Sequence, residues 1–271
     1  MRTVRPRLVF EFSKVPVYDS LHVRISSENP VSVPELFELA KKESGRPQSV
    51  GHALVTRVAL HDKNEKDGLG TDASELYQKT GTISLSYLAD GSWVTGFVDL
   101  EGNEEDCNLV QAGYNANQRY EELIIAVKDR SICDLIQHAQ NTNRVAQALT
   151  QNPTTLGTIK KNGKSAYGQY PYAKALFGSS KLAELNASYL HKNKNCEAKI
   201  YGPTAEDIAR TLKGKEDSAL VRAVGLGGDG FVGVYGVYAD GDFYDGGWAR
   251  SVVHVGAQNS PSEKKVRKVR A

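Results

Sequence analysis

Lysines and tyrosines are interleaved with glycines in one stretch of the chain, between Lys160 and Lys174. Lysine ammonium groups neutralise phosphates, and tyrosine rings stack on unpaired bases, so this mixture is typical of proteins that bind single-stranded nucleic acid. A basic loop that packs its tyrosines against its own protein would have the same composition. We predict that nucleic-acid contacts come from Lys160, Lys161, Lys164, Tyr167, Tyr170, Tyr172 and Lys174.

Basic residues also gather in a C-terminal tail, residues 263–271. We predict that this tail adds phosphate contacts through Lys264, Lys265, Arg267, Lys268 and Arg270. The formal net charge of +2 conceals a segregation of charge, because residues 61–130 carry fourteen acidic side chains against six basic ones, whereas residues 151–200 carry eight lysines against two glutamates. Segregation of this kind recruits polyanions, although a solubilising tail and a solvated loop would look the same.

The motifs of known enzyme classes are incomplete in this chain. Gly163-Lys164-Ser165 matches the end of a P-loop, but Thr158 stands where that motif needs a glycine, and Tyr170-Pro171 follows too soon for its helix. The chain has no G-x-S-x-G and no H-E-x-x-H motif. We therefore predict a non-enzymatic protein. The alternative is an enzyme whose site is assembled from scattered residues, with candidates His22, His191, His254 and the aspartates near Asp242.

Two acidic stretches, Asp62 to Asp72 and Asp240 to Asp245, carry the carboxylates that calcium prefers, but neither has the spacing of an EF-hand loop. We interpret both as acidic turns, with a bound cation left open, and predict no metal site and no cofactor. His52 lies in an apolar run with Leu54 and Val58 and is interpreted as a core histidine rather than a catalytic base.

Glycine is concentrated late in the chain, with nine of the 25 glycines between Gly225 and Gly247. A dinucleotide-binding fingerprint is excluded, because a strand-like pattern follows Gly230 where that motif needs a helix. The nine residues from Gly225 to Gly233 resemble the glycine-rich loop of CRISPR RNA-processing proteins, which implies close approach of RNA to the backbone. They lack the basic residue of that loop, and a glycine-rich turn between two strands is the alternative.

Composition restricts the class of protein further. With 271 residues, of which 40% are hydrophobic and 24% charged, the chain is predicted to be folded and soluble. No apolar run reaches the roughly 18 residues of a membrane span, and the first residues lack the apolar core of a signal peptide. We therefore expect a cytoplasmic protein without membrane contact. Cys107, Cys133 and Cys196 are too few and too widely spaced for a disulfide framework or a structural zinc site.

Hydrophobic periodicity predicts the elements that hold these residues. Strands are expected in an opening hairpin (8–12 and 21–25), at 50–61, in a second hairpin around an Asp90-Gly91 turn, at 198–201, and in three or four segments after residue 219. Helices are expected after Ser32, at 120–127, at 131–139, around 173–190, and from a Thr204 cap to Gly214. Residues 154–172 are expected to form a long loop.

This order of elements predicts an α+β protein, with antiparallel sheet from the N- and C-terminal strands and a central group of amphipathic helices. Residues 1–262 are predicted to form a single domain, with a candidate subdivision near residue 152, followed by the basic tail. The leading functional hypothesis is a non-enzymatic protein that binds single-stranded RNA or DNA as a subunit of a nucleoprotein assembly, with itself or other proteins as partners. The alternative is a self-assembling structural protein of the phage or viral shell kind, since segregated charges also join copies.

Overall fold

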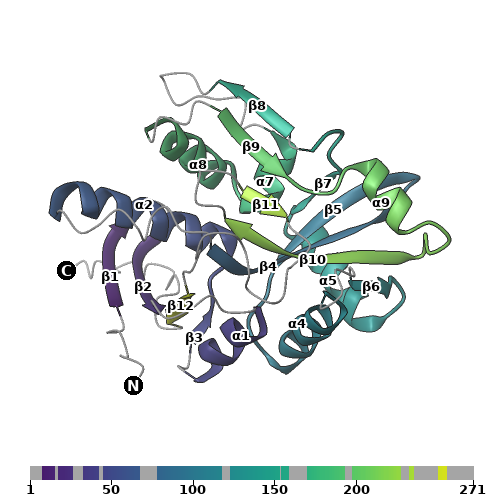
Figure 1. Ribbon diagram of the computed structural model, residues 1–271, viewed down its shortest axis with the longest axis horizontal. Coiled ribbons are helices and arrows are strands. Elements are labelled where there is room, and N and C mark those ends of the chain that lie inside the picture. The colour runs from purple at the N-terminus through teal and green to yellow at the C-terminus, as the bar shows by residue number, and fades with distance from the viewer. Residues whose placement is uncertain are drawn as a thin grey trace, which may run out of the picture.

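The computed structural model describes residues 8–15, 18–26, 33–42, 45–67, 78–117, 123–152, 154–158, 170–192, 197–226, 232–234 and 250–254. Over these residues the fold is α+β, as predicted. A large sheet carries helices on both faces, and a small sheet lies to one side of it (Figure 1). The basic tail and residues 159–169 are outside the described part of the chain.

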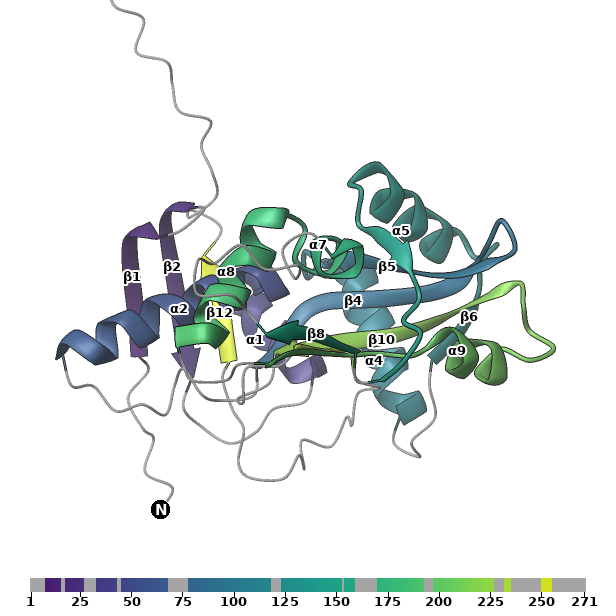
Figure 2. The same ribbon diagram turned by 90° about the horizontal axis from the view of Figure 1, so that it is seen from above.

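The large sheet has eight strands in the order β7-β5-β4-β10-β11-β9-β8, with β6 also paired to β10. Its two long strands, β4 and β10, are antiparallel and run side by side across the molecule (Figure 2). The Asp90-Gly91 turn joins β4 to β5 as predicted, and both of its residues have positive φ angles, as a two-residue hairpin turn requires. The strands are β4 (Gln78–Ala89), β5 (Ser92–Asp99), β6 (Leu123–Ala126), β7 (Val145–Gln147), β8 (Thr154–Thr158), β9 (Glu197–Tyr201), β10 (Ser218–Leu226) and β11 (Val232–Val234).

The small sheet confirms that strands from the two ends of the chain pair with one another. Its order is β1-β2-β12-β3, and every neighbouring pair is antiparallel. The predicted opening hairpin forms between β1 and β2, with Phe10 opposite Val23. The bounds are β1 (Leu8–Val15), β2 (Tyr18–Ser26), β3 (Gly45–Pro47) and β12 (Arg250–His254).

Helices cover both faces of the large sheet. On one face, α1 (Val33–Lys42), α4 (Glu104–Asn117) and α5 (Arg130–Asn141) pack against the side of β4 that bears Ile83, Leu85 and Tyr87. The opposite face is covered by α2 (Val50–Asp67), α7 (Pro171–Phe177), α8 (Ser180–Lys192) and α9 (Ala205–Thr211). In the described part of the chain, none of the helices has both the length and the apolar character needed to cross a membrane.

The prediction of a strand at 50–61 is wrong, because this segment is the start of helix α2. Ser49 caps that helix: its hydroxyl accepts a hydrogen bond from the backbone N–H of His52 at 3.2 Å. Most positions from Val50 to Val58 are buried, so the helix has no solvent-exposed face here and its sequence shows no helical period. Its valines, which are enriched in strands, then led to the prediction of a strand.

Three further expectations differ from the structure. The helix expected at 120–127 is instead strand β6, and β8 occupies the start of the expected loop. Helix α4 was not predicted, because its polar, asparagine-rich sequence has a weak apolar period. The helix expected around 173–190 is two helices, α7 and α8, and it is interrupted at Gly178, whose φ of +77° is left-handed.

The other face of β4 carries hydroxyl side chains instead of apolar ones, and they are buried too. The Thr80 hydroxyl donates to the Val224 carbonyl at 2.7 Å, and the Ser84 hydroxyl donates to that of Arg222 at 3.3 Å. Ser86 pairs with Thr95 of β5 at 3.1 Å. Each buried hydroxyl thus has a partner, so the alternation of apolar and polar residues on β4 does not mark a solvent face.

The small sheet meets the large sheet where Pro47 of β3 lies against Gly81 of β4. The backbone N–H of Gly81 donates to the carbonyl of Gln48 at 2.7 Å. A Cβ atom on Gly81 would lie 2.6 Å from the Cβ of Pro47, closer than two carbon atoms can approach. The absence of a side chain at Gly81 therefore permits this contact between the sheets.

We predict that Gly81→Ala destabilises the protein by about 2 kcal/mol, because the new methyl group forces β3 and β4 apart. Gly113→Ala in helix α4 is the matched control: its Cβ would meet only the Leu123 side chain, at an ordinary 3.6 Å. Since alanine favours a helix over glycine, this variant should gain about 1 kcal/mol. Urea unfolding of both variants checks the pair, and equal stabilities would contradict the close contact at Gly81.

Candidate functional site

The structure describes only three of the residues predicted to contact nucleic acid. Lys160, Lys161, Lys164 and Tyr167 lie in the segment 159–169, outside the described residues, and the same holds for the tail residues. Tyr170, Tyr172 and Lys174 lie at the start of helix α7. Tyr170 and Lys174 are both half-buried, and Tyr170 packs against the core.

Tyr172 is part of the core and not of the surface. Its side chain is 2% exposed, and its ring meets that of Phe97 edge to face with the ring centres 5.3 Å apart. Burial raises the pKa of its phenol well above the ordinary value. In this position the ring cannot stack on a base, so Tyr172 does not belong among the predicted nucleic-acid contacts.

Strand register shows where the lysine-containing segment attaches to the fold. Leu226 pairs with both Gln78 and Val232, Val232 pairs with Ile200, and Ile200 pairs with Thr154. These pairs fix the strand directions: β8 and β10 end, and β4, β9 and β11 begin, toward the same end of the sheet. Strands β8 and β9 extend beyond the level of Leu226, because Thr154 is the first residue of β8 and Ile200 lies near the end of β9. We call this end of the sheet the connection end. Four segments attach there, residues 68–77, 159–169, 193–196 and 227–231, all outside the described part of the chain.

The glycine-rich stretch also belongs to the connection end. Gly225 and Leu226 are the last residues of β10, and Val232 to Val234 form β11, which returns antiparallel beside it. The stretch therefore connects two strands that pair with one another, as the alternative of a glycine-rich turn between two strands requires.

A buried arginine contacts the end of β10. Arg57 of α2 is 1% exposed, and its guanidinium donates to the carbonyl of Leu226 at 3.1 Å. Burial lowers the pKa of Arg57 to about 10, an effect that Tyr189 of α8 partly opposes. The Tyr189 ring in turn contacts His61 edge to face. Arg57 is not among the residues predicted from the sequence, although an arginine inside the apolar run 50–60 was the available signal.

A second buried arginine fixes helix α7, which follows the lysine-containing segment. The guanidinium of Arg144 is 2.6 Å from a carboxylate oxygen of Asp99 on β5. It also donates to the carbonyls of Ala175 at 3.0 Å and Leu176 at 2.8 Å, in the last turn of α7. Carbonyls at a helix C-terminus lack partners within the helix and carry partial negative charge, so a buried cation satisfies them.

The Asp99 carboxylate extends this network to helix α2. Its second oxygen accepts a hydrogen bond from the Thr82 hydroxyl at 2.6 Å, and the Thr82 oxygen accepts one from the backbone N–H of Val50 at 2.8 Å. The N-terminus of α2 and the C-terminus of α7 are thus joined through side chains of β4 and β5.

His52 lies one turn into α2, next to this network. Its Nδ1 is 3.1 Å from the Ser49 hydroxyl, which also accepts a hydrogen bond from the His52 backbone N–H. Burial lowers the pKa of His52 to about 4, with Asp99 opposing and Arg46 reinforcing the effect. A base this weak does not activate a serine near neutral pH, so the Ser49–His52 pair is a helix cap.

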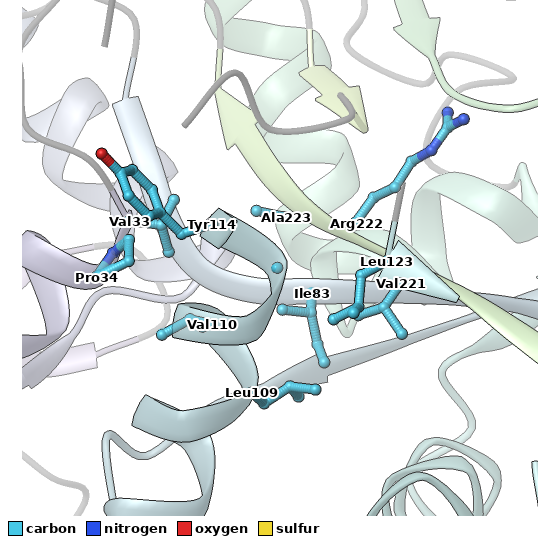
Figure 3. A pocket seen from close by; sticks show the side chains of 11 residues that line it. Val33, Pro34, Ile83, Leu109, Val110, Tyr114, Leu123, Val221, Arg222 and Ala223 are labelled. Carbon is cyan, nitrogen blue, oxygen red and sulfur yellow. The ribbon is translucent and has the colours of Figure 1, made fainter. Parts of the chain in front are cut away.

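A small pocket lies on the other face of the sheet, between α1, α4 and strands β4, β6 and β10 (Figure 3). Its walls are mostly apolar, including Val33, Val110 and Leu123, and the guanidinium of Arg222 points away from them. The cavity holds about 30 Å³, enough for one or two water molecules and far below the space that a cofactor needs.

The scattered residues considered for an enzyme are placed in part. His22 lies on β2, His254 on β12 and His191 near the end of α8, whereas Asp242 and the stretch 240–245 are outside the described residues. Asp62 to Asp67 form the last part of α2, and 68–72 are outside the described residues. Among the side chains that the structure describes, no group of three histidines, cysteines or acids could hold a metal ion.

Comparisons with known proteins identify a fold and no family. No family model matches the chain, and no curated protein matches it. A similar solved structure is described as "Accommodation of massive sequence variation in Nanoarchaeota by the C-type lectin fold". The match has a TM-score of 0.52 and 12% sequence identity, and it covers 93% of this chain and 99% of that one. The likeness shows the fold. This chain has an architecture similar to the C-type lectin fold.

We predict that Arg144→Met destabilises the protein by about 3 kcal/mol, because the change leaves Asp99 and two helix-terminal carbonyls without their cation. The matched control is Arg130→Met on α5, whose ion pair with Asp134 is 3.9 Å long and exposed to water. This control should have no measurable effect. Thermal unfolding of the two variants checks the prediction, and equal melting temperatures would contradict it.

Stability should also depend on pH through His52. The unfolded histidine takes up its proton near pH 6.5, whereas the folded one does so only near pH 4. Stability is therefore lost as the pH falls through this window, by at most about 3 kcal/mol. Denaturant unfolding at pH 7, 5.5 and 4.5 measures the slope, which should be shallower in His52→Gln. An unchanged slope in that variant would assign the acid sensitivity to other groups.

Proposed function

We propose that this protein is a non-enzymatic binding protein that contacts its ligand with the connection end of the large sheet, and that the ligand is single-stranded RNA or DNA. The observation that supports this most strongly is the convergence of four connecting segments at one end of a packed scaffold. One of these segments contains Lys160, Lys161 and Lys164. Binding residues are often carried on loops that a rigid scaffold positions.

The attachment of the lysine-containing segment supports this proposal. The segment leaves β8 after Thr158, next to Glu197 in the sheet, and re-enters the fold at Tyr170, which packs on the core. Both of its ends are therefore held by the scaffold, and Lys174 follows one helical turn after Tyr170. Lysines on such a segment neutralise phosphates, and the tail residues Lys264 to Arg270 add phosphate contacts. The binding is cytoplasmic and takes place within an assembly of several subunits.

The test is fluorescence anisotropy of labelled single-stranded RNA and DNA, titrated with the full chain across a salt series. We expect saturable binding with a log–log salt slope of about −3 or steeper, since each neutralised phosphate contributes about −0.7. Replacing Lys160, Lys161 and Lys164 with glutamate should weaken binding at least about tenfold without changing the melting temperature.

The matched control replaces three other lysines with glutamate, so that the change in net charge is the same. Lys41 on α1 and Lys213 and Lys215 after α9 are exposed and lie on other elements, so their replacement by glutamate should leave the affinity nearly unchanged. An equal loss of affinity in both triple variants would indicate a general effect of net charge and would contradict the proposed binding site. Absence of binding at low salt would contradict the proposal that the ligand is single-stranded nucleic acid. Large symmetric particles in light scattering would favour the alternative of a shell-like structural protein.

A second candidate function is recognition by a surface whose sequence varies. The observation that favours it is the fold match at 12% identity over 93% of the chain, to a structure described as accommodating massive sequence variation. A fold that persists with so little identity leaves surface segments free to change while buried positions keep their volume. In this function the variable residues lie at the connection end, and they determine which ligand the protein binds.

This candidate predicts an uneven tolerance to substitution. Randomising residues 160–167 should leave the melting temperature within about 2 °C, because this function assigns these positions to ligand contact and not to packing. Leu54→Ala and Leu176→Ala, each at 0% exposure, should each cost about 3 kcal/mol. Thermal scans of a small variant library check this difference. Frequent unfolding of the 160–167 variants would show that the segment is structural.

A further inference from the structure

The pocket between α1, α4 and the large sheet is suited to bind one small apolar side chain. Its walls are mostly aliphatic, and a cavity of this kind holds water poorly because its walls offer few hydrogen bonds. Among the described residues that line it, only Arg222 is charged, and its guanidinium points away from the cavity (Figure 3). A cavity of about 30 Å³ has room for a group such as the isopropyl group of valine.

Exposed glutamates lie next to this pocket on both helices that form it. On α1, Glu35 directly follows Pro34, which lines the pocket. On α4, Glu105 lies one helical turn before Leu109, another lining residue, and residues four apart share a helix face with their Cβ atoms about 6 Å apart. The sequence of α4 contains no lysine or arginine. These surroundings favour a ligand with cations on either side of a small apolar group.

The basic tail of this chain has that chemistry. In an extended segment, Lys264 and Lys268 lie on the same face as Val266, because side chains two residues apart share a face. Each of the two lysines is then about 7 Å from the valine along the chain, close to the spacing of a glutamate from the pocket lining. The other valine of the tail, Val269, falls on the opposite face.

The tail is attached close enough to reach the pocket of its own chain. The last described strand before it, β12, contacts helix α1, and the two elements lie side by side in Figures 1 and 2. Helix α1 has ten residues and is about 15 Å long. The chain from His254 to Val266 spans up to about 40 Å when it is extended. A segment tethered this closely has an effective concentration on the order of millimolar, so weak contacts suffice to hold it.

We propose that the basic tail docks against its own chain and places the Val266 side chain in the pocket between α1 and α4. The lysines that share its face, Lys264 and Lys268, then lie next to the two glutamates. Burial of one valine side chain favours the docked tail by about a factor of ten, and the exposed ion pairs add little to this. In the proposed function these lysines contact phosphates, so a nucleic-acid strand has to displace the tail. This consequence rests on the proposed function, whereas the docking does not.

The experiment treats the full chain with a carbodiimide, which couples a lysine amine to a carboxylate only where the two are in contact. We expect mass spectrometry to find the tail lysines coupled to Glu35 or Glu105. A mixture of isotope-labelled and unlabelled chains identifies the source of the tail, because coupling within one chain gives peptides that are labelled in both parts or in neither. Peptides with one labelled part would show docking on a second copy and would overturn the proposal, as would the absence of these crosslinks.

Two pairs of variants test the role of the pocket. Gly113→Leu fills the pocket with a new side chain and should lower the crosslink yield at least about fivefold, since valine burial contributes about a factor of ten. Leucine also favours a helix over glycine, so the variant should fold. The matched control is Ala112→Leu, at an exposed position of the same helix outside the pocket lining, which should leave the yield unchanged.

The second pair changes the tail and leaves the pocket intact. Val266→Asp should lower the crosslink yield as much as the filled pocket does, whereas Val269→Asp on the opposite face should not. Equal yields in these two tail variants would overturn the placement of Val266. All of these measurements are made without nucleic acid, so their outcome is independent of the anisotropy test of the proposed function.

Discussion

The Arg144 guanidinium joins elements that are distant in the sequence. It contacts Asp99 of β5 and two carbonyls at the end of α7, and through Asp99 and Thr82 it is linked to the start of α2. A buried cation needs several partners before it offsets its lost hydration, and here the partners come from a strand and a helix terminus. The positions of α7 and α2 over the sheet therefore depend on one another, and so does the point at Tyr170 where the segment 159–169 enters α7.

This arrangement separates the part of the protein that sets the fold from the part proposed to bind. The apolar cluster beneath α2, α7 and α8 includes Leu54, Phe97 and Leu176, all essentially without exposure. The connecting segments attach at one end of the sheet, beyond Leu226 and Thr158. In the proposed function, changes in those segments alter ligand contacts, whereas the buried clusters of the scaffold keep their packing.

Local sequence patterns predicted the elements with strong signals of their own. The capping residue Thr204, the Asp90-Gly91 turn and the alternation of Leu8 to Phe12 each specify a local conformation, and each prediction is confirmed. Helix α2 was mistaken for a strand because burial on nearly all sides removes the period on which such predictions depend. Tyr172 was mistaken for a surface residue for a related reason: composition identifies a tyrosine in a basic stretch, but only packing shows that its ring faces Phe97.

The candidate sites differ in how far the sequence could reveal them. The lysines from Lys160 to Lys164 are neighbours in the chain, so composition alone finds them. His22 and His254 are more than 200 residues apart, and no spacing rule relates them. The strands that contain them become neighbours only in the folded chain, because β12 pairs with β2. Bringing such distant strands together costs loop-closure entropy that grows only slowly with the length of the chain between them, so a few strand hydrogen bonds can offset it. A contact of this kind is therefore visible only once the strand order is known, whereas a run of lysines is visible in the sequence itself.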